Sequence, residues 1–243
     1  METNRATTSA GVAILVGLVA GVLSIVPVIE RPDYLSLIPT HVPEIMLGAA
    51  FQLLMIPAYV GFALYLHPTL NVVHPTLSLA FVGFRLLAGM CHLLGVILLP
   101  LFLVLGHAYV GSEAGTDHIA LLGDLLRSGR ELINHVALIL SLTISDLILF
   151  RLLHRSRLVP RWLSAWGFVG AGLAMLASLL LLAGSLQVVT PTYLAMNASL
   201  ALQSIVLAAW LIARGFDTTA LPCSPNPDEH QDGRSRMPPA AKA

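Results

Sequence analysis

Charged residues are scarce in this chain. Only 11% of its 243 residues are Asp, Glu, Lys or Arg, whereas a soluble domain carries about 25%. The 13 basic and 13 acidic residues cancel at neutral pH. A chain without a basic surplus lacks the electrostatic field that attracts nucleic acid. We therefore expect no nucleic-acid partner, and the low charge favours a membrane protein.

Cysteines and recognisable cofactor motifs are equally scarce. Cys91 lies in an apolar segment and Cys223 in a polar stretch near the end of the chain, so we expect no disulfide between them. The sequence contains no phosphate-binding glycine loop, no CxxC pair and no HExxH motif. From the sequence we predict neither a metal site nor a bound cofactor.

Apolar residues, in contrast, make up 56% of the chain and give it a mean hydropathy of +0.82. A helix of about 20 apolar residues crosses the hydrocarbon of a bilayer, and only helices or closed barrels satisfy the backbone there. Six segments are long enough: 9–29, 43–66, 78–106, 131–152, 162–186 and 193–213. The sequence therefore predicts an all-α, six-transmembrane-helix bundle over residues 1–216. A proline-rich and charged stretch follows over 217–243, where we expect a disordered tail.

Arginines are concentrated between the fourth and fifth predicted helices. Arg151, Arg155, Arg157 and Arg161 fall within eleven residues, and Trp162 follows at once. Basic links favour the cytoplasmic side of a membrane, and tryptophan favours the interface. We therefore expect this basic corner, both termini and the tail in the cytoplasm, in a multi-pass protein of the cell (inner) membrane whose main partner is the lipid bilayer.

Two opposite charges lie inside adjacent predicted helices. Arg85 is about 10 Å and Asp146 about 8 Å from the cytoplasmic ends of the third and fourth helices, at ~1.5 Å per residue. Either charge alone would be costly in hydrocarbon, by at least ~2.5–3.5 kcal/mol. We expect the two to form an ion pair, which either fixes helix register or lets Arg85 hold a ligand anion.

Other polar residues suggest a cavity among the second, third, fourth and sixth predicted helices, opening outward. Each would contribute a polar side chain within or at the mouth of an otherwise apolar segment. They are Glu44, Gln52, Tyr59, His92, Glu131, His135, Asn197 and Ser204.

Several occupants and roles are compatible with this pattern. The histidines can simply bond between helices, ligate a haem as a pair, or bind a metal together with Glu131. A buried carboxylate and a histidine could also catalyse acid–base chemistry on a lipid or isoprenoid. We favour a protein that binds or passes a small, partly apolar ligand over an enzyme. Small residues repeat every four positions on the first and fifth helices, which favours packing within one chain, with a homo-oligomer as the alternative.

Four stretches of the sequence resemble one family of bacterial membrane proteins, the domain of unknown function 4386. They are AGVAILVGLVAGVLSIV, FVGFRLLAG, SRLVPRWLSAWGFVGA and SLALQSIVLAAWLIARGF. The resemblance implies a multi-helix inner-membrane protein and no established activity. Its helix-three arginine corresponds to Arg85, and its basic corner to Arg157, Pro160, Arg161 and Trp162. Gln52 and Ala88 stand where relatives often carry glutamate. If those glutamates form a site in relatives, this chain lacks that chemistry or uses Asp146 instead.

Overall fold

The computed structural model describes residues 2–112, 116–188 and 190–217, and within these ranges the regular structure is entirely helical. Six helices are long and apolar enough to cross a membrane, as the sequence predicts. They are α1 (Glu2–Leu23), α3 (Val42–Val73), α4 (Pro75–Gly111), a continuous helix from Asp117 to Ser156, α7 (Arg161–Leu182) and α8 (Pro191–Ala213). The predicted tail lies outside the described residues except for Asp217.

The continuous helix has three parts. It begins as α5 (Asp117–Leu132), passes through one π-helical segment, η3 (Ile133–Ala137), and ends as α6 (Leu138–Ser156). A π-helical turn inside an α-helix often marks a functional position. Here it separates the charged α5 from the apolar α6.

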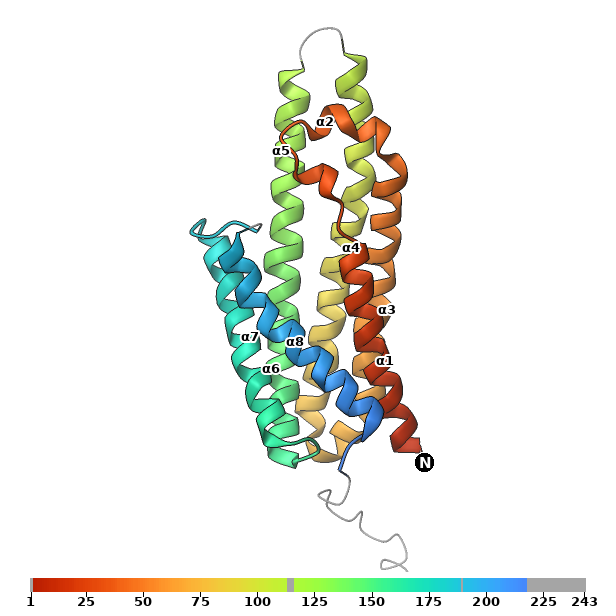
Figure 1. Ribbon diagram of the computed structural model, residues 1–243, viewed down its shortest axis with the longest axis vertical. Helices are drawn as coiled ribbons and strands as arrows, with labels where there is room; N and C mark the ends of the chain where they lie inside the picture. The colour runs from red at the N-terminus through yellow and green to blue at the C-terminus, as the bar shows by residue number, and fades with distance from the viewer. Residues whose placement is uncertain (1, 113–115, 189, 218–243) are drawn as a thin grey trace, which may run out of the picture.

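The six helices form a closed ring (Figure 1). Going round it, α1 packs on α3, α3 on α4, α4 on α6, α6 on α7, and α7 on α8. The last helix, α8, crosses the front of the bundle obliquely and closes the ring on α1. Gly11 permits this closure, because a Cβ atom there would lie only 2.8 Å from the carbonyl oxygen of Ala208.

Two helices are much longer than a membrane is thick. The 37 residues of α4 and the 40 of the α5–α6 helix correspond to roughly 55 and 60 Å, against ~30 Å of hydrocarbon. Their ends project past α7 and α8 (Figure 1). We call this projecting part, with the segment 24–41 that covers it, the head.

The head has its own apolar core. The segment 24–41 contains η1 (Pro27–Glu30), α2 (Tyr34–Leu37) and η2 (Ile38–Thr40). Of these, α2 and η2 pack on α4, and η1 packs on α2. The guanidinium of Arg127 stacks over the Tyr34 ring at 5.2 Å, and the Tyr34 hydroxyl bonds to Asp124 at 3.4 Å. Burial, with the nearby Asp124 carboxylate, raises the pKa of Tyr34 to about 12. The apolar core of the head consists of Val26, Val28, Ile29, Tyr34, Leu35, Ile38, Ile45, Ala49, Val96, Leu99 and Phe102.

Helix limits differ from the sequence prediction at several places. The first helix begins at Glu2 and ends at Leu23, before Pro27, instead of spanning 9–29. The second continues through Pro68 to Val73. The fourth begins at Asp117 rather than at 131, because α5 carries charges that a hydropathy criterion rejects although its backbone is helical.

Candidate functional site

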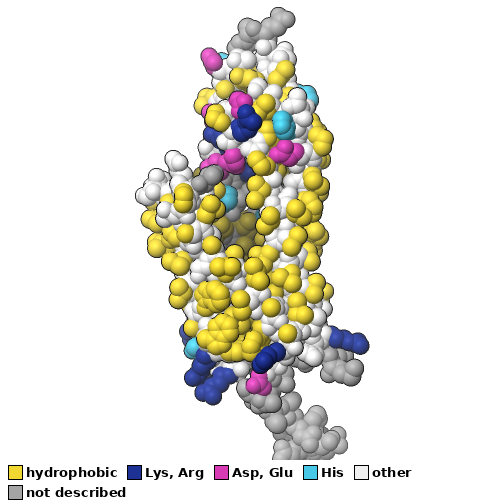
Figure 2. All heavy atoms as spheres, in the orientation of Figure 1, with side chains coloured by type: hydrophobic (Ala, Val, Ile, Leu, Met, Phe, Trp, Pro, Cys, Tyr) yellow, Lys and Arg dark blue, Asp and Glu magenta, His cyan; other side chains and the backbone are white. Residues whose placement is uncertain are grey.

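A cavity of about 270 Å³ lies inside the ring. Its walls come from all six helices of the ring, and the surface is hollowed between the upper part of α8 and α1 (Figure 2). Most of the lining is aliphatic or aromatic. The lining residues are Ile14, Leu18, Ala58, Tyr59, Phe62, Arg85, Ile139, Leu142, Asp146, Leu149, Phe150, Ala174, Asn197, Leu200, Ala201, Gln203, Ser204 and Leu207.

The Arg85 guanidinium of α4 and the Asp146 carboxylate of α6 form an ion pair in the wall of this cavity. The two side chains are only 8% and 14% exposed. The Arg85 Nε atom also donates to the Ser145 hydroxyl at 3.1 Å. That hydroxyl donates in turn to the Phe81 carbonyl oxygen at 3.0 Å. The two helices that the sequence pairs are thus joined by three consecutive polar contacts.

Aromatic rings complete the surroundings of Arg85. Its guanidinium carbon lies 5.0 Å from the Phe62 ring centroid and 5.7 Å from that of Phe81. A cation over an aromatic face is stabilised, and more so when it is desolvated. Arg85 is therefore held by a carboxylate, a hydroxyl and two rings.

Three of the eight expected cavity residues line the cavity beside this pair: Tyr59, Asn197 and Ser204. Asn197 donates to the Tyr193 carbonyl oxygen at 2.9 Å, and Ser204 to that of Leu200 at 2.9 Å. The Tyr59 hydroxyl forms no hydrogen bond with the residues that the structure describes. Tyr59 can therefore still donate to and accept from a guest molecule.

Sequence reasoning missed Gln203, which lines the same cavity. Its side-chain nitrogen donates to the Leu163 carbonyl oxygen at 3.2 Å, while its Oε1 atom is buried without a partner in the described part of the chain. Ser145, next to Asp146, was missed as well. Both residues sit beside a residue that was chosen, and helical geometry places neighbours about 100° apart. The sequence alone does not indicate that the faces of α6 and α8 that carry Ser145 and Gln203 also point into the bundle.

The other five expected residues lie towards the head and do not line this cavity. Glu44 is in the first turn of α3, and Glu131 lines a separate pocket beside Glu30 and Arg127. Gln52, His92 and His135 are also absent from the cavity wall. Of the eight residues expected in one cavity, three therefore line the ring cavity and five lie nearer the head.

Buried polar atoms without partners are a feature of this headward level. Among the described residues they include Gln52 Oε1, both ring nitrogens of His92, Asn134 Oδ1 and Arg130 Nε. Asn134 belongs to η3 and lies directly against Gly95 of α4. Buried polar atoms are usually bonded, so this level is the least satisfied part of the interior.

The two membrane histidines contact different tyrosines. The His92 ring stands edge-on to Tyr59, with centroids 6.1 Å apart. The His135 ring stands edge-on to Tyr193 at 5.7 Å, and its Nδ1 atom bonds to the Tyr193 hydroxyl at 2.9 Å. In the part of the chain with described structure, no three His, Cys, Asp or Glu side chains are grouped as metal ligands.

The basic corner lies between α6 and α7, at the end opposite the head. Its members Arg151, Arg155, Arg157, Arg161 and Trp162 are all exposed. Charged side chains gather at the two ends of the molecule, and apolar side chains cover the surface between them (Figure 2). This distribution suits a bundle that crosses a bilayer.

A closed ring of six membrane-length helices with a charged pair in its cavity defines a multi-pass membrane protein. The chain belongs to the family described as domain of unknown function 4386, whose model matches residues 9–215. No curated protein and no solved structure matches it. The matched range includes the basic corner and both residues of the ion pair.

Proposed function

We propose that this protein binds or passes a small, partly apolar ligand in the ring cavity. The observation that carries the proposal is the composition of the cavity wall. Aliphatic and aromatic side chains from five of the six helices surround a few polar groups, and α4 contributes Arg85. The polar groups are Arg85, Asp146, Tyr59, Asn197, Gln203 and Ser204. Ligand sites are commonly apolar hollows with a small number of well-placed polar groups. Its volume of about 270 Å³ suits a small molecule or one end of a longer one.

The charged pair indicates what polar group the ligand would carry. Asp146 already neutralises Arg85, so a ligand carboxylate or phosphate would compete with a covalently tethered anion. A neutral group that both donates and accepts, such as a hydroxyl or an amide, would meet unused N–H groups of Arg85 and the carboxylate together. This favours a neutral amphiphile over the ligand anion considered from the sequence.

A ligand could enter from the lipid between α1 and α8, where the two helices are not in close contact along their whole length. The helices α1 and α8 touch closely at Gly11 and Ala208, near the arginine-rich end. Further towards the head, the surface between them is hollowed (Figure 2). If the positive-inside rule holds for this chain, the hollow faces the outer leaflet of the inner membrane and the termini lie in the cytoplasm.

Ligand capture by the purified protein tests the proposal. The protein is extracted with its surrounding lipid, and the small molecules that accompany it are identified by mass spectrometry. Replacing half-buried Leu142 of the cavity wall with Trp should fill the cavity and remove the ligand. The matched control is Leu202→Trp, at a position on α8 that is 56% exposed and outside the cavity wall. Equal ligand recovery from both variants would refute the cavity as the site.

The same preparation separates binding from catalysis. An enzyme acting on a lipid or isoprenoid would convert the captured molecule over time, whereas a binding or transport protein would return it unchanged. Chemical conversion that stops in Leu142→Trp would replace the binding proposal with the enzymatic one.

A further inference from the structure

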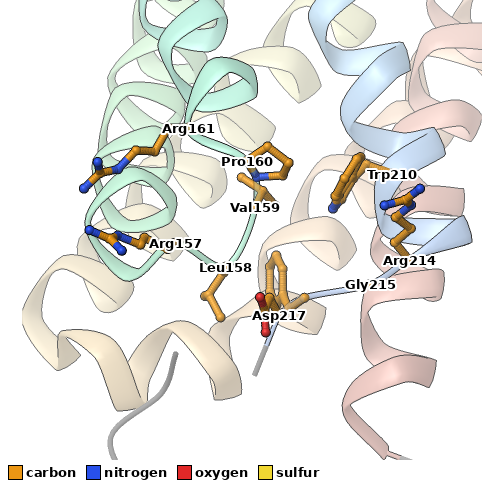
Figure 3. Close-up of a pocket in the computed structure, with 10 residues that line it drawn as sticks. Arg157, Leu158, Val159, Pro160, Arg161, Trp210, Arg214, Gly215 and Asp217 are labelled. Carbon is orange, nitrogen blue, oxygen red and sulfur yellow. The ribbon is translucent and has the colours of Figure 1, made fainter. Parts of the chain in front are cut away.

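A second pocket, of about 570 Å³, opens at the arginine-rich end of the bundle (Figure 3). It lies between the corner that joins α6 to α7 and the stretch that follows α8. It shares no lining residue with the ring cavity. The lining residues are Arg157, Leu158, Val159, Pro160, Arg161, Trp210, Arg214, Gly215, Phe216 and Asp217.

The floor of this pocket is anchored in the protein interior. Leu158 and Val159 are 0% and 2% exposed and belong to the apolar core at this end. After α8 the chain turns at Gly215, whose φ is +70°. The Asp217 backbone N–H then donates to the Leu158 carbonyl oxygen at 3.0 Å. The corner and the stretch after α8 are therefore fastened to each other.

The rim carries an excess of positive charge. Arg157 and Arg161 line the pocket from the corner, with their guanidinium groups directed outward, away from Trp210, and Arg214 lies on the other side beside Trp210 (Figure 3). The Arg214 guanidinium stacks on the Trp210 ring at 5.0 Å. Asp217 is the only acidic residue that lines the pocket. Three cations and one anion leave the rim two charges positive.

Arg157 also has an unusual backbone. Its φ of 58° is left-handed, and it is the only non-glycine residue with positive φ in the described ranges. Glycine adopts this conformation freely, but a side chain there is strained. A long cationic side chain at a position that suits glycine indicates that the charge itself is useful.

We propose that this pocket binds the head group of an anionic phospholipid. Arginine suits a phosphate because its planar fork donates two hydrogen bonds in parallel. The partly exposed Pro160, Trp210 and Phe216 offer apolar surface for the glycerol and the upper acyl chains. Basic pockets between transmembrane helices are suited to acidic head groups in this way. The pocket lies at the end of the spans, where head groups are located.

Thermal unfolding in lipid nanodiscs tests the proposal. The protein is compared in phosphatidylcholine alone and in an equal mixture with phosphatidylglycerol. The mixture should raise the unfolding temperature of the natural protein, and Arg157→Gln with Arg161→Gln should abolish the rise. Direct titration of phosphatidylglycerol should show about a fivefold loss of affinity for each arginine removed. The matched control, Arg151→Gln with Arg155→Gln, removes the same charge from the same corner outside the pocket.

The control distinguishes a site from general attraction. If the two double variants lose the same amount of the phosphatidylglycerol effect, the arginines act as a surface field and the proposal is overturned. Inorganic phosphate, added to discs of phosphatidylcholine, is the second arm. Stabilisation by phosphate alone, equal to that by phosphatidylglycerol, would show that the pocket takes a free anion and not a lipid.

Arg157→Gly separates the lipid role from the fold. Because glycine relieves the left-handed backbone, this variant should unfold at a higher temperature than the natural protein in phosphatidylcholine. It should nevertheless lose part of the rise given by phosphatidylglycerol. A full phosphatidylglycerol response in Arg157→Gly would overturn the role assigned to this side chain.

Discussion

At the scale of single residues, Arg85 is tolerated in the membrane because its surroundings leave it neither alone nor hydrated. Asp146 neutralises it, Ser145 accepts from its Nε atom, and Phe62 and Phe81 flank its plane. A buried pair of this kind is not automatically stabilising, because both ions lose their hydration. What it does supply is a strong preference for one register between α4 and α6.

Removing one partner should therefore be far worse than removing both. Asp146→Asn leaves a buried guanidinium without a counter-ion and should reduce the free energy of unfolding by roughly 3–5 kcal/mol. Arg85→Met with Asp146→Leu removes both charges and should be much less harmful than the sum of the two single variants. Reversible unfolding in detergent, analysed as a double-mutant cycle, measures the coupling. Additive losses would mean that the two residues act independently.

At the scale of elements, the π-helical segment η3 packs directly against α4. A Cβ atom on Gly95 would lie within 2.5 Å of Asn134 Oδ1, closer than any real contact allows. Gly95→Ala should therefore displace the Asn134 side chain and reduce the free energy of unfolding by about 1–3 kcal/mol, as overpacking does. The measurement is thermal or denaturant unfolding of the purified protein.

The control for this change lies on the same helix. A Cβ atom on Gly83 of α4 would meet nothing within 4 Å. Gly83→Ala should accordingly be neutral or stabilising by up to ~1 kcal/mol, because alanine favours helix over glycine. Adding Asn134→Ala to Gly95→Ala should recover part of the loss. If Gly83→Ala and Gly95→Ala behave alike, the close contact with η3 has no energetic importance.

The number and kind of elements were predictable from sequence, but their lengths were not. Apolar runs fix where lipid-crossing helices must be, because the backbone has no other solution in hydrocarbon. Hydropathy cannot find α5, whose charges lie outside the membrane while its backbone continues α6. It also ended the second helix too early, although α3 accommodates both Pro57 and Pro68.

The sequence predicts the candidate site only for the residues whose depth in the membrane is enough to bring them together. Arg85 and Asp146 could be paired because both are rare in lipid and lie equally far from the arginine-rich end. Which polar residues share one cavity depends on helix rotation and on the oblique path of α8. Tyr59, Asn197 and Ser204 line the ring cavity for that reason, whereas His92 and Gln52, which lie nearer the head, do not. No pattern in the sequence reports the crossing of α8 over α1.

At the scale of the whole molecule, the two ends differ in charge. Among the described residues, the head and the adjoining first turn of α3 carry six acidic residues, Glu30, Asp33, Glu44, Asp117, Asp124 and Glu131, alongside Arg31, Arg127 and Arg130. In the described ranges, the opposite end carries six arginines against two acidic residues, Glu2 and Asp217. The arginines are Arg5, Arg151, Arg155, Arg157, Arg161 and Arg214. Since arginine-rich ends are retained in the cytoplasm, the asymmetry predicts a single orientation with the head outside.

Labelling of single cysteines on intact cells tests this orientation. With Cys91 and Cys223 replaced by serine, Asn4→Cys places a thiol on an exposed position at the arginine-rich end, and His118→Cys places one on the head. A maleimide that cannot cross membranes should modify His118→Cys directly, and Asn4→Cys only after the cells are permeabilised. The reverse pattern would invert the molecule, which would turn the ring-cavity hollow towards the inner leaflet and the arginine-lined pocket towards the outer one. The anionic-lipid proposal depends most on this result, because the positive-inside rule is what places its rim beside the acidic lipids of the cytoplasmic leaflet.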